Sequence, residues 1–144
     1  MQVQHILKDK ENNAIVTVAP GSTLAEVAET LSAHRIGAVL VSPDGKRVEG
    51  IVSERDVVRV LGRMGAACLA SKVEAVMTPD PEAAGLSEDV DSVMNRMSRG
   101  GFRHMPVIEA GELVGVVSIR DVVKAQVAKL SMEKEALTGM IMGN

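Results

Sequence analysis

Two sets of polar side chains in this sequence have the types and the spacing that chemistry requires. Each set holds a serine, an arginine and an aspartate: Ser53, Arg55 and Asp56, then Ser118, Arg120 and Asp121. A serine followed three residues later by an acid is typical of a capping box, which satisfies free backbone N–H groups at a helix start. The same turn could bind a ligand, because its acid can accept hydrogen bonds from ribose hydroxyls and a helix N-terminus attracts phosphate. The pattern alone favours capping, although one turn can do both.

The two sets belong to a longer internal repeat. Residues 50–58 and 115–123 are identical at seven of nine positions, at a separation of sixty-five. Upstream, apolar residues still match at a separation of sixty-six: Leu24, Val27, Leu31 and Ile36 with Val90, Val93, Met97 and Phe102. The one-residue difference falls in the loop 42–46, which is typical of a hairpin turn between apolar strands. The chain is therefore one unit written twice.

The periodicity of each copy predicts the elements that position these side chains. Apolar residues at helical spacing predict one helix with a buried stripe per copy, and short apolar runs predict strands. In the first copy the expected order is strand, helix, strand, strand, helix, at residues 15–18, 24–33, 38–41, 48–52 and 55–62. This predicts an α+β fold of two β-α-β-β-α repeats around a pseudo-two-fold axis, as two half-domains that share one core. We expect the repeats at 5–70 and 71–130, with a joint near 71–82 and a helical tail at 131–144.

The arginines and one further pair of residues strengthen the ligand hypothesis. A guanidinium forms paired hydrogen bonds with phosphate oxygens, although an arginine in a first helical turn can equally be a solvated surface charge. Its presence in both copies favours the ligand. Arg103 and His104 add a cation and a hydrogen-bonding ring before an apolar strand, but their first-copy counterparts are Gly37 and Ala38. This asymmetry predicts one better phosphate site rather than two equal ones.

Composition and motifs exclude several functions. Hydrophobic residues make up 46% of the 144 residues and charged residues 24%, which is typical of a soluble globular protein, and the expected compartment is the cytoplasm. A net charge of -3 without Trp or Tyr argues against nucleic-acid binding. The single cysteine, Cys68, is expected to be a small buried or half-buried filler. No catalytic or metal-binding motif occurs, so we expect a non-catalytic protein.

Residues 5–130 as a whole resemble a tandem pair of CBS domains, a Bateman module, of the small stand-alone kind. The resemblance rests on Gly50-Ile-Val-Ser-Glu-Arg-Asp56, on Gly115-Val-Val-Ser-Ile-Arg-Asp121 and on Arg103-His-Met-Pro-Val107. Met77-Thr78 also resembles the connector that precedes a second copy in this family. The second copy departs from the pattern at its first strand, where Pro81-Glu-Ala-Ala84 replaces Ile15-Val-Thr-Val18.

The resemblance implies a sensor that binds AMP, ADP or ATP in clefts between the copies, with NAD(H) or S-adenosylmethionine as related candidates. It implies ribose and phosphate contacts for the Ser and Asp of each turn, and phosphate contacts for Arg55, Arg120, Arg103 and His104. It implies an adenine pocket of side chains and backbone at Thr17, Val18, Ile36, Ala38, Met105 and Pro106. The departure at residues 81–84 puts one of the two adenine pockets in doubt.

The resemblance also bears on partners. It implies a homodimer, which the aliphatic surfaces and the tail would suit, and a separate regulated protein that the sequence does not identify. For the tail, packing on a partner chain and packing within the chain both remain open. The main alternative function is an interaction scaffold whose clefts stay empty. An enzyme acting in the cleft and a nucleic-acid binder are further alternatives, in that order.

Overall fold

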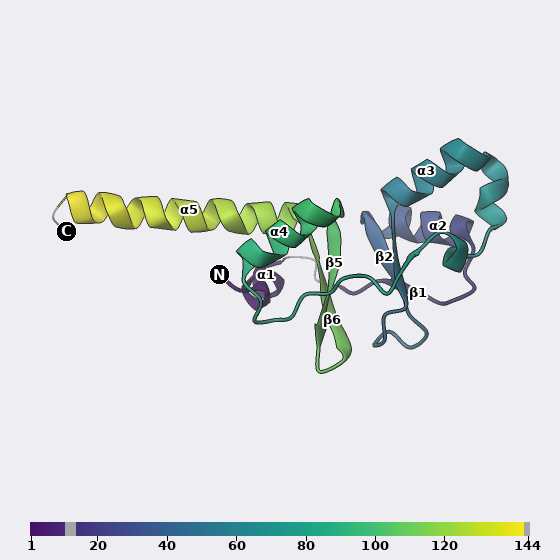
Figure 1. Cartoon of the computed structure of the whole chain (residues 1–144), viewed down its shortest axis with the longest axis horizontal. Coiled ribbons are helices and arrows are strands. Elements are labelled where there is room, and N and C mark those ends of the chain that lie inside the picture. Colours follow the sequence, from purple (N-terminus) through teal and green to yellow (C-terminus); the bar gives the residue numbers. More distant parts are fainter. Residues whose placement is uncertain (11–13, 143–144) are drawn as a thin grey trace.

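The computed structural model describes residues 1–10 and 14–142. It contains two halves that lie side by side, each with helices against a small sheet, and a long C-terminal helix that extends away from them (Figure 1). This confirms the predicted α+β fold of two repeats. None of the helices in the described ranges combines the length and the apolar character needed to cross a lipid bilayer.

The first half has the element order that the repeat predicts. Its elements are β1 (Thr17–Val18), α2 (Leu24–His34), β2 (Ala38–Val41), β3 (Gly50–Ser53) and α3 (Glu54–Met64). The predicted bounds differ from these by at most two residues. In the sheet, β1 runs parallel to β2 and β2 runs antiparallel to β3. The turn that holds Ser53 therefore leads directly from a central strand into a helix.

The second half repeats this order with a weaker first strand. Its elements are α4 (Val90–Gly100), β5 (His104–Glu109), β6 (Glu112–Ser118) and α5 (Ile119–Ile141). In place of a counterpart to β1, a single parallel bridge joins Ala84 to Val107. Pro81 has no N–H to donate and alanine has low strand propensity, so this segment gains little from pairing. The departure seen in the sequence thus reduces a strand to one bridge.

The segment that precedes each copy packs with the other copy. Helix α1 (Val3–Asp9) lies against the second half, where Val3 and Ile6 are buried in its core. The 3-10 turns at Ala66–Ala70 and Val73–Ala75 cover the first half, and Cys68 is fully buried there as expected. The connector strand β4 (Thr78–Pro79) pairs antiparallel with β3. Each half therefore closes around a segment from outside its repeated motif, and the boundaries 5–70 and 71–130 stay a prediction.

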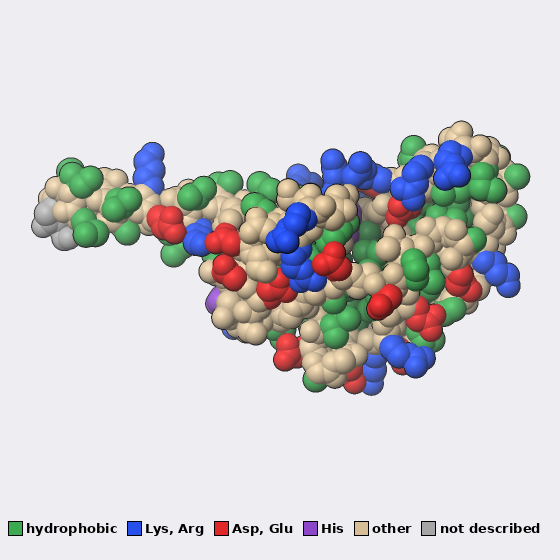
Figure 2. All heavy atoms as spheres, in the orientation of Figure 1, with side chains coloured by type: hydrophobic (Ala, Val, Ile, Leu, Met, Phe, Trp, Pro, Cys, Tyr) green, Lys and Arg blue, Asp and Glu red, His purple; other side chains and the backbone are tan. Residues whose placement is uncertain are grey.

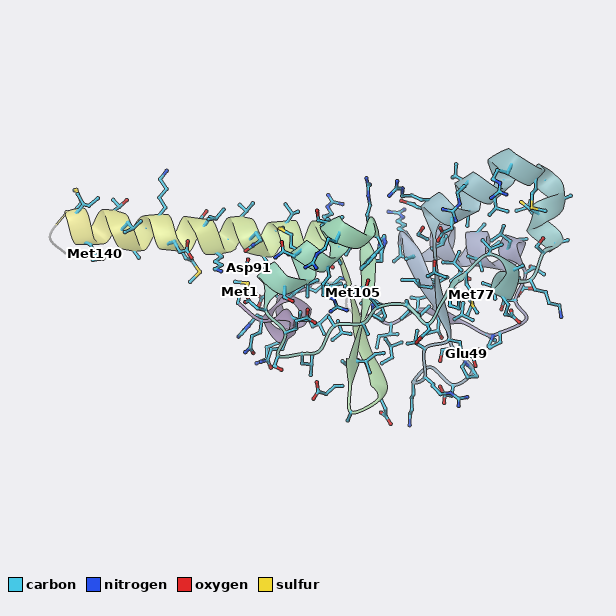
Figure 3. The ribbon with its side chains drawn as sticks, viewed as in Figure 1. Met1, Glu49, Met77, Asp91, Met105 and Met140 are labelled. Atoms are coloured by element: carbon cyan, nitrogen blue, oxygen red, sulfur yellow. The ribbon has the colours of Figure 1, made fainter. Side chains whose placement is uncertain are left out.

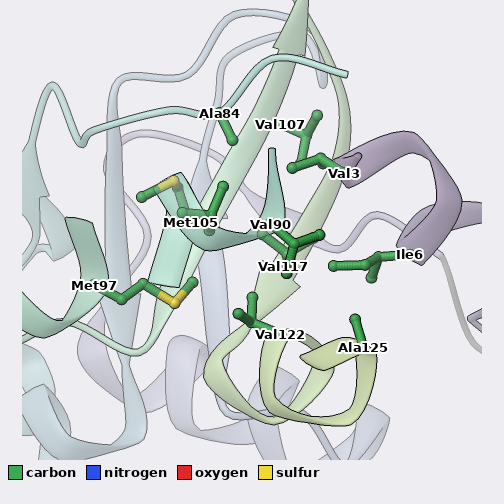
Figure 4. Close-up of a cluster of buried hydrophobic side chains, with 11 residues drawn as sticks. Val3, Ile6, Ala84, Val90, Met97, Met105, Val107, Val117, Val122 and Ala125 are labelled. Carbon is green, nitrogen blue, oxygen red and sulfur yellow. The ribbon is translucent and has the colours of Figure 1, made fainter. Parts of the chain in front are cut away.

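Two separate hydrophobic clusters stabilise the molecule. One contains residues of the first half such as Leu24, Val39 and Val52. The other contains residues of α1 and the second half (Figure 4), including Met105, which Figure 3 labels beside β5. The expectation of one shared core is therefore wrong, because the helices of each half cover their own sheet.

The glycine that opens each repeated motif is needed for close packing. A side chain at Gly115 would meet Leu7 of α1, with a Cβ only 2.8 Å from the Leu7 methyl carbons. At Gly50 the corresponding neighbour is Met77 of the connector, whose sulfur would collide with a Cβ. The two glycines thus admit the exchanged segments, which fixes those segments beside the serine and aspartate turns.

Candidate functional site

The two turns that carry serine and aspartate have the same local geometry. Ser53 caps α3 and Ser118 caps α5, and each forms a capping box with its aspartate. The Ser53 N–H donates to Asp56 Oδ2 at 2.8 Å, and the Ser118 N–H donates to Asp121 Oδ2 at 2.9 Å. The capping hypothesis is therefore confirmed for both turns. Caps of this kind contribute roughly 1 kcal/mol each, and a capping carboxylate can still accept further hydrogen bonds.

A cavity of about 520 Å³ lies where the first turn faces the second half. The first half contributes its turn, and the second half contributes the end of α4 and the start of β5. Its lining consists of Gly37, Ile51, Ser53, Glu54, Arg55, Asp56, Arg59, Thr78, Gly100, Gly101, Phe102, Arg103 and His104. The structure thus brings together five of the predicted site residues from two separate parts of the sequence: Ser53, Arg55, Asp56, Arg103 and His104.

The cavity is lined by more positively than negatively charged side chains. Arg55, Arg59 and Arg103 supply three positive charges, and Glu54 and Asp56 supply two negative ones, which leaves one net positive charge. On the face shown in Figure 2, Lys and Arg side chains gather along the upper edge where the two halves meet. The start of α3 adds the positive end of a helix dipole. The lining thus has an excess of positive charge beside a helix N-terminus.

His104 is a half-buried titratable group that lines this cavity. Its ring lies against Gly37, where an added Cβ would stand 3.0 Å from Nε2. Burial lowers the pKa of His104, and the charges of Glu54 and Asp121 only partly oppose this effect. The imidazole is therefore neutral near pH 7 and becomes easier to protonate when an anion arrives.

The second turn has different neighbours. Asp121 accepts a salt bridge from Lys10, whose Nζ lies 2.9 Å from Asp121 Oδ2. Burial alone would raise the pKa of Asp121, but the Ser118 N–H and the Lys10 ammonium together lower it. Neither Ser118, Arg120 nor Asp121 lines the cavity described above. The second turn nevertheless adjoins the backbone of Arg103 and His104, because His104 pairs with Ser118 across β5 and β6 and the Ile119 N–H donates to the Arg103 carbonyl oxygen at 2.7 Å.

The residues predicted around adenine are not gathered in the cavity. Thr17 and Val18 form β1, and Ala38 begins β2 opposite Ser53. Ile36 lines a different groove, between α2 and α3. The Met105 side chain is fully buried in the core and Pro106 is buried beside it, so these two positions could offer a ligand only backbone atoms. The adenine pocket stays a prediction.

Several residues at the two turns escaped sequence reasoning. Glu54, Arg59, Thr78 and Phe102 line the cavity, and Lys10 binds Asp121. Arg59 was recognisable in principle, because it lies three residues after Asp56 in a helix and donates to Asp56 Oδ1 at 2.9 Å. Lys10 gave no local signal, since 111 residues separate it from its partner. Among residues 1–10 and 14–142, no group of three or more His, Cys, Asp or Glu side chains could hold a metal ion.

Known proteins are similar to this chain in sequence and in fold. The family model described as CBS domain matches residues 8–63 and again residues 73–128. A CBS-domain containing protein from Agrobacterium tumefaciens has a crystal structure with 41% sequence identity and a TM-score of 0.82, covering 88% of this chain and 99% of that one. An uncharacterised 17.7 kDa protein from Acidianus ambivalens is 36% identical over 112 residues, covering 77% of this chain and 66% of that protein.

A further solved structure is of a CBS domain protein from Pyrobaculum aerophilum complexed with AMP. It is 27% identical with a TM-score of 0.73, covering 84% of this chain and 89% of that one. The chain spans between 23% and 66% of the first curated relatives that it matches.

Proposed function

The chain belongs to the CBS-domain family, and from this premise we propose that it is a regulatory module that binds an adenine nucleotide in the cavity at Asp56. The ligand is AMP, ADP, ATP or a related adenosyl compound such as NAD(H) or S-adenosylmethionine. The observation that carries the proposal is the meeting, in one cavity, of the Ser53 and Asp56 turn with Arg103 and His104. A relative with this fold is complexed with AMP, which supports the same ligand class here.

Each polar group of the cavity has a role in this proposal. Asp56 accepts hydrogen bonds from the ribose hydroxyls, because its carboxylate is fixed by the Ser53 N–H and is partly exposed to the cavity. Arg55, Arg103 and His104 bind phosphate oxygens, together with the N-terminus of α3. The roles that the family resemblance implies for Ser118, Arg120 and Asp121 belong to a second cleft, at the turn where Asp121 pairs with Lys10.

Fewer observations support the position of the adenine base than support the positions of the ribose and the phosphate. Ile51, Thr78 and Phe102 supply the apolar part of the cavity lining, and they offer a surface against which a base can pack. The resemblance instead favours the backbone and side chains around Ile36, Ala38 and Pro106. Both sets flank the first turn, so the base is proposed to lie on one side of Asp56 and the phosphates on the other.

Ligand binding would change how the two halves are arranged relative to each other. The cavity wall comes from both of them, so a bound nucleotide favours the arrangement in which Asp56 and Arg103 face each other. The size of this effect equals the difference in ligand affinity between the closed and the open arrangement. The signal is then passed to a separate regulated protein, and no reaction is required.

A second copy of the chain is the first partner to consider. Val58, Leu61 and Met64 are exposed on α3, and Leu130, Leu137 and Met140 are exposed on α5, whose far end Figure 3 labels at Met140. Apolar residues of this number on two helices favour a protein interface. Within the described part of the tail, residues 131–142 are almost all exposed, and on this ground a homodimer is the proposed assembly. Light scattering after size exclusion tests it, and a monomer at micromolar concentration would contradict it.

Thermal unfolding of nucleotide-free protein tests the function itself. A ligand that binds the native state raises the unfolding midpoint by mass action. We expect a saturable rise with AMP, ADP, ATP or another adenosyl ligand and a much smaller one with the guanosine counterparts. An Asp56→Asn variant should lose most of that rise. If folded, nucleotide-free protein responds to none of these ligands, the interaction scaffold with empty clefts becomes the better description.

A further inference from the structure

The outer edges of the two equivalent strands β3 and β6 both have a described contact at the matching position. In the first half, the backbone of β4 pairs with β3, with Ile51 opposite Thr78. In the second half, the residue that matches Ile51 is Val116. Its carbonyl oxygen accepts a hydrogen bond from Lys10 Nζ at 2.9 Å. The ammonium of Lys10 therefore binds the outer edge of β6 at the position that matches Ile51.

The same ammonium binds the aspartate of the second turn. Lys10 Nζ lies 2.9 Å from Asp121 Oδ2, and the two side chains are only 26% and 20% exposed. Hydrogen bonds between charged groups are stronger than neutral ones, and partial burial reduces their screening by salt. At the matching position of the first half, Asp56 pairs instead with Arg59, which is 58% exposed and lies at the rim of the open cavity.

A nucleotide at the second turn would face two obstacles. Its ribose hydroxyls would have to displace Lys10 from Asp121 or share the carboxylate with it. Displacement would also leave the Val116 carbonyl without its ammonium donor.

We propose that Lys10 makes the two clefts unequal by holding Asp121 as its counter-ion, so that the chain takes up one nucleotide, at Asp56. Lys10 thus determines how many nucleotides one chain binds. This inference rests on the proposed function, because it assumes that the Asp56 cavity binds a nucleotide. In this proposal the repeated motif caps a helix in both halves, but only the first copy is open to a ligand.

Calorimetric titration with AMP tests the inference through the number of sites per chain. The variants are Lys10→Met, which keeps the length of the side chain and removes its charge, and the double variant Lys10→Met with Asp121→Asn. We expect one site in the wild type. Lys10→Met should show the same site plus a second one, because the Asp121 carboxylate then has no ammonium partner and can accept the ribose hydroxyls. The double variant should return to one site, and Lys10→Arg should keep one.

The outcomes separate this inference from the proposed function. Two sites in the wild type, one unchanged site in folded Lys10→Met, or weakened binding at the first site in that variant would each overturn the role of Lys10. Absence of AMP binding in the wild type, together with absence of any response to the other adenosyl ligands, overturns the proposed function instead. Circular dichroism melts of all four proteins establish that each is folded at the titration temperature.

Discussion

The clefts at Asp56 and at Asp121 contain turns of the same geometry but have different neighbouring side chains. Both turns have a capping box with an N–H to carboxylate distance of 2.8 or 2.9 Å. At Asp56 the other half supplies Arg103 and His104 and leaves a cavity of about 520 Å³. At Asp121 the N-terminal segment supplies Lys10. Duplication thus repeats the scaffold, whereas residues outside the repeated motif decide what each copy can bind.

The largest expected effect is a difference in AMP affinity between the variants of the two aspartates. Asp56→Asn should weaken AMP binding by about 10- to 100-fold, because a hydrogen bond to a charged group contributes roughly 1.5–3 kcal/mol. Asp121→Asn should change the affinity by less than about twofold, since this carboxylate already pairs with Lys10. Isothermal titration of both variants provides the comparison. Each variant loses the same cap bond, so the two are matched controls for one another.

The next largest effect is a difference in AMP affinity between the variants of two arginines. Arg103→Gln should weaken AMP binding about tenfold and leave adenosine binding nearly unchanged, because Arg103 lies in the cavity and contacts only the phosphate in this proposal. Arg120→Gln should leave both affinities within about twofold. If Arg120→Gln alone lowered the AMP affinity, this would support the phosphate contact that the family resemblance implies for Arg120.

A smaller effect concerns protonation of His104. Burial lowers its pKa in the free protein, and a bound phosphate should raise it. The complex then binds more protons than the free protein between these two pKa values, so AMP affinity should fall as pH rises through that window. The change is about tenfold for each unit by which the phosphate raises the pKa. The surrounding charges are those of Glu54, Lys10, Asp121 and Arg103.

The control for this pH dependence is the variant His104→Gln. The phosphate of AMP also titrates, with a pKa near 6, and this contribution is the same for both proteins. Only the difference between the two pH profiles reports on His104. Identical profiles between about pH 5 and pH 8 would contradict a phosphate contact for His104.

The smallest effect tests the close approach of the two halves. Gly37→Ala would put a Cβ 3.0 Å from His104 Nε2 and 3.1 Å from Cε1, so the ring must move by a few tenths of an ångström. We expect AMP affinity to fall about threefold, or roughly 0.6 kcal/mol. Gly62→Ala in α3 is the control, because nothing lies within 4 Å of the added Cβ. An unchanged affinity in Gly37→Ala would mean that the ring position matters little.

Local patterns in the sequence predicted most of the fold. The repeat and its apolar periodicity located both copies, because strands, helices and caps depend on residues close in sequence. The exchange of α1 and β4 between the halves could not be predicted. It depends on the glycines Gly50 and Gly115, whose neighbours Met77 and Leu7 lie far away in sequence.

The site was predicted in its residue types and only partly in its grouping. Sequence analysis predicted one better phosphate site from Arg103 and His104. In the structure His104 pairs with Ser118 across β5 and β6 and also shares a cavity with Ser53 and Arg55 of the first copy. Which turn meets which cation depends on how the two halves pack, and the contact between Lys10 and Asp121 depends on the path of the N-terminal segment. Neither is encoded in local spacing.

The most direct test of the difference between the clefts is a crystal structure of the full chain with AMP. We expect the ribose hydroxyls within hydrogen-bond distance of Asp56, the phosphate beside Arg103 and His104, and Lys10 still paired with Asp121. AMP bound at Asp121 with Lys10 displaced, and no ligand at Asp56, would contradict the claim that neighbours from outside the repeated motif select the binding copy.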